Sequence, residues 1–153
     1  MTKFITFFVL LFSMSFCGAQ DVCSQLKSMV EYAKDDFRLL KGAAVGSGKY
    51  SRFKSTENLP GARTCEIKSR KSGAVLECIW DRISDPPTQA KGMANTVGQC
   101  FDRKVRPSDD EGSEDKTEVS YYFRLPDGVS ISVSIGNTLV GENRVALDIR
   151  HRP

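Results

Sequence analysis

The stretch CEIKSRKSGAVLECIW, residues Cys65 to Trp80, decides how this chain folds. Apolar and polar residues alternate on both sides of a short polar turn that contains Gly73, which is the pattern of a β-hairpin. Folding the stretch about residues 71 and 72 brings Cys65 nearly opposite Cys78, because the two cysteines are equidistant from that point. The sequence therefore predicts an antiparallel hairpin in which these two cysteines face each other.

An amphipathic helix is expected before the hairpin, between Asp21 and Lys41. Asp21 can cap its start, and Gly42 lies where a helix commonly stops. Residues 43–63 contain several glycines and prolines and are interpreted as a long connection to the hairpin. The apolar residues of the helix recur at steps of three and four: Val22, Leu26, Met29, Val30, Ala33, Phe37 and Leu40.

A second helix and three further strands are expected after the hairpin. Residues 84–87, Ser-Asp-Pro-Pro, open the helix, since proline is tolerated in a first turn. Residues 107–116 form a polar, acidic loop, and period-two patterns predict strands at 118–125, 129–135 and 144–150. The resulting order, α-β-β-α-β-β-β, indicates an α+β fold: an antiparallel sheet of about five strands with two helices on one face.

The first 19 residues have the three parts of a signal peptide. Lys3 is followed by an apolar run from Phe4 to Phe16 and by small residues up to Ala19, so cleavage after Ala19 is expected. The run is too short to cross a bilayer comfortably, because a transmembrane helix needs about 20 apolar residues. We therefore expect residues 1–19 to be a leader and residues 20–153 to form one exported domain, periplasmic or secreted.

Cys17 suggests a rival interpretation of the leader, in which lipid is attached to its sulfur as in bacterial lipoproteins. The processing enzymes of that route favour a small residue before the cysteine, whereas Phe16 is bulky. We therefore expect no lipid at Cys17 and no stable membrane anchor in the mature chain.

Cleavage after Ala19 leaves four cysteines. An even number in an exported chain indicates two disulfides, for which three connectivities exist. If the elements alternate in direction, the helices run antiparallel and the start of the first lies near the end of the second. This arrangement favours Cys23 with Cys100 and Cys65 with Cys78. Zinc is the competing interpretation, but no cysteine pair has C-x-x-C spacing, and we expect no metal site.

The charge balance gives no electrostatic reason to expect nucleic acid or an anionic membrane as partner. The chain has a net charge of +3, which falls to +2 without the leader because Lys3 is its only charged residue.

Catalytic and cofactor motifs are incomplete. Nucleophilic catalysis needs a histidine to take the proton, and the only one, His151, is interpreted as a solvated residue of the C-terminal tail. Residues 46–49, Gly-Ser-Gly-Lys, resemble a phosphate loop superficially, but Ala43 and Tyr50 stand where the motif needs glycine and a hydroxyl. The acidic run has Pro107 where a calcium loop needs its first carboxylate. We expect no cofactor and assign no catalytic residue.

The aromatic residues indicate where a partner protein could bind. Trp80 shares a strand face with Cys78 and belongs to the core, whereas Tyr121 and Tyr122 are consecutive and must point to opposite faces of one strand. An outward tyrosine beside Arg124 suits contact with a partner protein, because interfaces are enriched in tyrosine and arginine. Tyr121, Tyr122 and Arg124 are therefore the candidate partner-binding residues.

These features favour a small binding module over an enzyme. The expected function is non-enzymatic binding of another protein, as an inhibitor or an immunity-type factor, because a rigid disulfide-stabilised domain binds with little ordering cost. Two alternatives stay open, a small carboxylate-dependent hydrolase and a carrier of a small apolar ligand. Two facing carboxylates in a cleft would favour the hydrolase, a deep apolar cavity the carrier, and a filled core with an exposed aromatic patch the binder.

Overall fold

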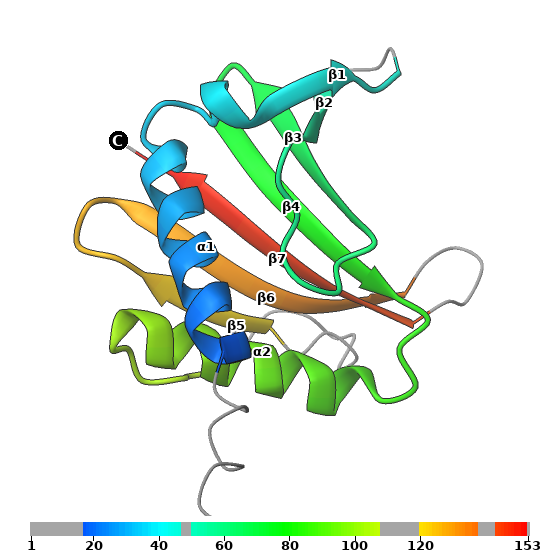
Figure 1. The fold of residues 1–153 in the computed structure, drawn as a ribbon, viewed down its shortest axis with the longest axis vertical. Coiled ribbons are helices and arrows are strands. Elements are labelled where there is room, and N and C mark those ends of the chain that lie inside the picture. Colours follow the sequence, from blue (N-terminus) through cyan, green and yellow to red (C-terminus); the bar gives the residue numbers. More distant parts are fainter. Residues whose placement is uncertain (1–16, 47–49, 108–119, 138–142, 153) are drawn as a thin grey trace, which may run out of the picture.

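In the part of the chain that the structure describes, seven antiparallel strands form one sheet, and both α-helices lie on one of its faces (Figure 1). The computed structural model describes residues 17–46, 50–107, 120–137 and 143–152. The strand order is β1-β2-β3-β4-β7-β6-β5, and this α+β architecture confirms the predicted fold class. The elements are α1 (Cys17–Ala33), the short 3-10 helix η1 (Arg38–Leu40), β1 (Lys41–Ala44), β2 (Ser51–Ser55), β3 (Thr64–Arg70), β4 (Gly73–Asp81), α2 (Pro86–Phe101), β5 (Ser120–Arg124), β6 (Val129–Asn137) and β7 (Asn143–His151).

The predicted hairpin is β3–β4, and it lies near the middle of the sheet. Cys65 and Cys78 are register partners and form a disulfide. Alternate residues of β4 are buried from Ala74 to Trp80, as the period-two pattern requires. The indole N–H of Trp80 donates to the Pro60 carbonyl at 3.2 Å, which attaches the segment before β3 to the core.

The first helix is shorter than predicted, because it ends at Ala33 rather than Lys41. Asp36 and Phe37 have φ angles of 49° and 55°, a left-handed conformation that a helix cannot contain. Phe37 and Leu40 are still buried in the core, Phe37 from a turn and Leu40 from η1. Their positions in the sequence continue the helical spacing, which is why the predicted helix was too long. An Asp36 carboxylate oxygen accepts a hydrogen bond from the Ala74 N–H at 2.9 Å and fixes this turn to β4.

Two strands were not predicted. β1 and β2 occupy part of the segment that was expected to be a long connection, and β2 pairs with β3. Most of their residues are exposed or half-buried, and Phe53 is the one large apolar residue of β2. Strands without a buried face leave little period-two signal, which explains why the expected sheet had about five strands.

The second helix begins where the sequence predicted. Asp85 caps it by accepting a hydrogen bond from the Thr88 N–H at 3.2 Å, and Pro86 occupies the first turn. β5, β6 and β7 confirm the three later strands with shifts of one or two residues at most ends. Most of the acidic loop lies outside the described residues.

Both predicted disulfides are present. Cys23 of α1 is bonded to Cys100 of α2, residues 77 apart in sequence. The start of α1 therefore lies near the end of α2, but the two helices cross rather than run antiparallel as expected (Figure 1). Two disulfides are typical of proteins that fold outside the reducing cytosol. None of the helices that the structure describes combines the length and the apolar composition that a membrane span requires.

The core fills the space between the helices and the sheet. Leu26 and Met29 of α1 and Val97 of α2 are almost completely buried there. The strand residues on this side are apolar, whereas the opposite side of the sheet carries mainly charged and hydroxyl residues. The buried strand residues facing the helices include Ile67, Leu76, Cys78, Phe123, Ile131, Val133, Val145, Leu147 and Ile149.

Candidate functional site

The two tyrosines of β5 point in opposite directions, as their adjacency predicted. Tyr121 belongs to the core with 9 % of its surface exposed, whereas Tyr122 is 46 % exposed. Arg124, two residues further along β5, shares the outward side with Tyr122 and is exposed. Because β5 is the last strand of the sheet, this side-chain pair lies at the edge of the sheet.

The chain after α2 turns back and runs beside this edge. Asp102 adopts a left-handed conformation (φ 51°), and the N–H of Arg103 donates to the Gly98 carbonyl at 2.8 Å. Pro107 then forms an isolated antiparallel bridge with Tyr121. This return places residues 103–107 next to β5, although residues 108–119 separate the two segments in the sequence.

Gly98 makes the close return possible. A Cβ atom at this position would lie 2.7 Å from the Arg103 carbonyl oxygen and 3.0 Å from Val105, so a larger residue would push the returning chain away. The other glycine of α2, Gly92, has different surroundings. Gly98 permits the close packing of residues 103–105, whereas Gly92 has nothing within 4 Å of its Cβ position.

The return encloses a hollow of about 340 Å³, which we call the basic hollow. Four of its residues are cations and one is an anion, and no ion pair involves any of the four cations within the described part of the chain. Uncompensated cations around a concave surface attract negatively charged groups. The hollow is lined by Asp102, Arg103, Lys104, Arg106, Tyr122, Phe123 and Arg124.

Sequence reasoning found only part of this site. It identified Tyr122 and Arg124 but missed Arg103, Lys104 and Arg106, because a net charge near zero hides a local cluster. The signal that could have found them is three cations within four residues directly after a helix. Tyr121 is not available to a partner from this side, because it faces the core.

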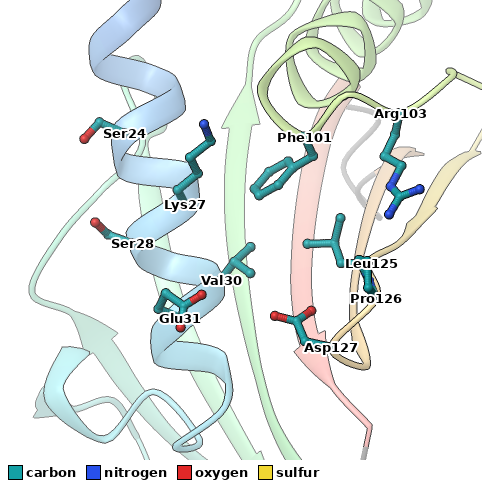
Figure 2. A pocket seen from close by; sticks show the side chains of 10 residues that line it. All are labelled: Ser24, Lys27, Ser28, Val30, Glu31, Phe101, Arg103, Leu125, Pro126 and Asp127. Atoms are coloured by element: carbon teal, nitrogen blue, oxygen red, sulfur yellow. The ribbon is translucent and has the colours of Figure 1, made fainter.

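A second hollow, of about 580 Å³, lies between α1 and the turn that joins β5 to β6 (Figure 2). Its floor is apolar and its edges are charged, and it is open to solvent on its outer side. We call it the apolar groove. Arg103 lines both the apolar groove and the basic hollow, so the two adjoin at the end of α2.

Three carboxylates form a row on the sheet face opposite the helices. Glu66 of β3 is the register partner of Glu77 of β4, which in turn is the partner of Asp148 of β7. Each has a cation: the closest contacts are Arg52 to Glu66 and Lys68 to Glu77, both 2.5 Å, and Arg150 to Asp148, 3.5 Å.

The charged form of Asp148, the β7 member of this row, is disfavoured by its surroundings. Burial raises its pKa, the Glu77 charge raises it further, and Arg150 and Lys68 oppose the shift. One of its carboxylate oxygens is buried and has no hydrogen-bond partner. Glu77 and Asp148 are thus two facing carboxylates, but neither of them lines the basic hollow or the apolar groove.

His151 is not in a solvated tail, which corrects that expectation. It is the last residue of β7, half-buried, and its register partner is Val129. In the described part of the chain, no group of three histidine, cysteine, aspartate or glutamate residues is placed to hold a metal ion. Residues 47–49 and the acidic run considered for calcium lie outside the described residues.

Comparisons with protein families, with curated proteins and with solved structures found no match to the chain.

Proposed function

We propose that this protein is an exported, non-enzymatic binding module that holds an acidic surface of another protein in its basic hollow. The observation that carries the proposal is the position of Tyr122, an exposed aromatic ring that lines the same hollow as four cations. Tyrosine and arginine, together with tryptophan, are enriched among the residues that dominate binding energy at protein interfaces.

The chemistry of the hollow favours carboxylates in particular. Three of the four cations are arginines, whose planar guanidinium groups can bind a carboxylate through two parallel hydrogen bonds. A positive surface also speeds encounter with a negative one, and it rejects basic partners. An acidic protein surface is therefore the best-matched occupant.

The frame of the hollow is held in place by the fold. Phe123 lies at its base and is buried, and the neighbouring end of α2 is attached to α1 by the Cys23–Cys100 disulfide. A surface that is already ordered loses little entropy when it binds. An inhibitor or immunity-type protein, which acts by covering an acidic site of its target, would benefit from this rigidity.

Export supports the same proposal. Residues 1–19 have the pattern of a cleaved leader, and the two disulfides need an oxidising compartment. We therefore place the mature chain, residues 20–153, in the periplasm or outside the cell.

The two alternative functions have less support. Glu77 and Asp148 face each other, but cations contact both of them, as in the ion-pair ladders that join strands. The apolar groove is open on its outer side, whereas carriers of small apolar ligands enclose most of the ligand surface.

Affinity capture from the periplasmic or extracellular fraction of the producing cells tests the proposal. The wild-type protein is compared with the charge-reversed variant Arg103→Glu/Arg106→Glu/Arg124→Glu and with a control that reverses three exposed lysines elsewhere, Lys54→Glu/Lys71→Glu/Lys91→Glu. We expect a partner to be captured by the wild type and the control but not by the hollow variant. Capture of the same proteins by all three, or a reproducible turnover activity with no partner, would overturn the proposal.

A further inference from the structure

The apolar groove has walls from three separate parts of the chain. α1 forms one wall from Ser24 to Glu31, and residues 125–127 of the β5–β6 turn form the other side (Figure 2). Phe101 at the end of α2 and Arg103 just after it contribute the third part. The Cys23–Cys100 disulfide lies directly beside Ser24 and Phe101, so a covalent bond ties two of these walls together.

The floor of the groove is apolar. Val30 and Leu125 are 3 % and 6 % exposed, and the half-buried Phe101 ring points into the same space (Figure 2). Binding of a large apolar side chain to such a floor is favourable, because it removes apolar surface of both groups from water.

The charges at the two ends of the groove differ. At one end Lys34 lies 2.9 Å from Glu31 and 2.8 Å from Asp127, so both carboxylates share a cation. At the other end Lys27 and Arg103 flank Phe101 (Figure 2), and neither has an ion pair within the described part of the chain. An occupant with a carboxylate at this second end would complement both cations.

The open side of the groove favours a protein segment over a small molecule as the occupant. A small molecule would stay in contact with water there, whereas a segment of a protein would cover the opening with its own body.

We infer that the apolar groove receives a large apolar side chain of the partner protein, with a carboxylate beside that side chain bound between Lys27 and Arg103. The inference rests on the proposed function, because Arg103 joins the groove to the basic hollow and one partner can lie across both. The inference also specifies the partner: the site binds an acidic segment that contains a leucine or an aromatic anchor, rather than any acidic surface.

Methyl NMR of the oxidised protein tests the inference, with the Val30 and Leu125 methyl groups as reporters inside the groove. The probes are the capped peptides Glu-Leu-Glu, Glu-Ala-Glu, which lacks the anchor, and Gln-Leu-Gln, which lacks the charge. We expect Glu-Leu-Glu to shift both reporters saturably, and each of the other two peptides to bind roughly tenfold more weakly, as loss of one such contact implies.

Two variants separate groove binding from a general effect on the fold. Lys27→Trp places a large ring on the groove side of α1 without removing a core residue (Figure 2), and Lys91→Trp makes the same change at an exposed position of α2 outside the groove. Binding of Glu-Leu-Glu is expected to be lost in the first variant and kept in the second.

Three results would overturn the inference. The first is that the Val30 and Leu125 reporters do not move with Glu-Leu-Glu, and the second is that dodecanoate, a small apolar ligand with a carboxylate, binds more tightly than the peptide. The third is that dilution alone shifts the reporters, which would indicate that a second copy of this chain occupies the groove. The proposed function is judged separately by the capture experiment. If the partner depends on the basic hollow while the reporters stay still, only the present inference fails.

Discussion

Asp148 of β7 lies directly opposite Glu77 of β4, so two carboxyl groups are neighbours on the sheet face that carries the charged residues. Burial and the Glu77 charge raise the pKa of Asp148, which means that the folded state holds this proton more tightly than the unfolded chain does. The contribution of Asp148 to stability is therefore fully present below the unfolded pKa of about 3.9. It is lost as the pH rises through the folded pKa.

The variant Asp148→Asn cannot ionise and avoids this loss. At pH 7 we expect it to be more stable than the wild type by about 1 kcal/mol, which raises the melting temperature by roughly 2–4 °C for a domain of this size. The gain should shrink as the pH falls towards 4. Urea unfolding of both proteins at several pH values checks this, with Glu66→Gln as a control that removes a carboxylate paired at 2.5 Å with Arg52 and should not stabilise. A gain independent of pH would contradict the account.

Gly98 and Gly92 lie on the same helix and should respond oppositely to substitution. Gly98→Ala places a methyl group 2.7 Å from the Arg103 carbonyl, so we expect a loss of about 1–3 kcal/mol. Gly92→Ala meets nothing within 4 Å and should gain about 0.5–1 kcal/mol from helix propensity. Chemical denaturation of the two variants tests the pair. Equal effects would mean that residues 103–105 do not return over α2.

The two disulfides should differ in what they contribute. Cys23 and Cys100 are 77 residues apart, whereas Cys65 and Cys78 are 13 apart. In the chain-entropy model these loops correspond to about 4.5 and 2.9 kcal/mol. We therefore expect the variant Cys23→Ala/Cys100→Ala to lose about 1.6 kcal/mol more than Cys65→Ala/Cys78→Ala. Urea unfolding of the two double variants measures the difference, and a larger loss from the hairpin bond would refute the ranking.

Lys34 pairs with Glu31 of α1 and with Asp127 of the β5–β6 turn, two residues that line the apolar groove. Its hydrogen bond to Asp127 lowers the pKa of that carboxyl group, so this contact is lost as the pH falls through the folded pKa of Asp127. In Lys34→Ala, we expect the pKa of Asp127 to rise towards its ordinary value. NMR titration of the Asp127 carboxyl carbon checks this. Arg38→Ala, which removes a cation paired with Asp35 instead, should leave the titration of Asp127 unchanged.

Much of the fold could be predicted because its central elements have one buried and one polar side. The hairpin, α2, the last three strands and both disulfides follow from period-two patterns, a capping aspartate and the positions of four cysteines. β1 and β2 could not be found in this way, because strands at the border of the sheet bury few side chains. The end of α1 was misplaced because a turn at Phe37 keeps helical spacing in the sequence while it breaks the helix.

The candidate site was only partly predictable, for a different reason. Alternation along one strand is a local property, so Tyr122 and Arg124 could be identified as outward residues. The approach of Arg103, Lys104 and Arg106 to that strand depends on the return of the chain over Gly98, a tertiary contact that no periodicity records. The apolar groove likewise combines two helices and a turn that are distant in sequence.

The affinity of the Tyr122→Ala variant for the captured partner tests the central claim most directly. The matched control is Tyr50→Ala, which removes another exposed tyrosine. The Tyr50 ring centroid lies 4.4 Å from the Arg70 guanidinium, and Tyr50 lines neither the basic hollow nor the apolar groove. If the basic hollow is the binding site, the dissociation constant should rise about thirtyfold for Tyr122→Ala, the effect of a 2 kcal/mol hot spot, and stay unchanged for Tyr50→Ala. Equal affinities of wild type and Tyr122→Ala would contradict the account.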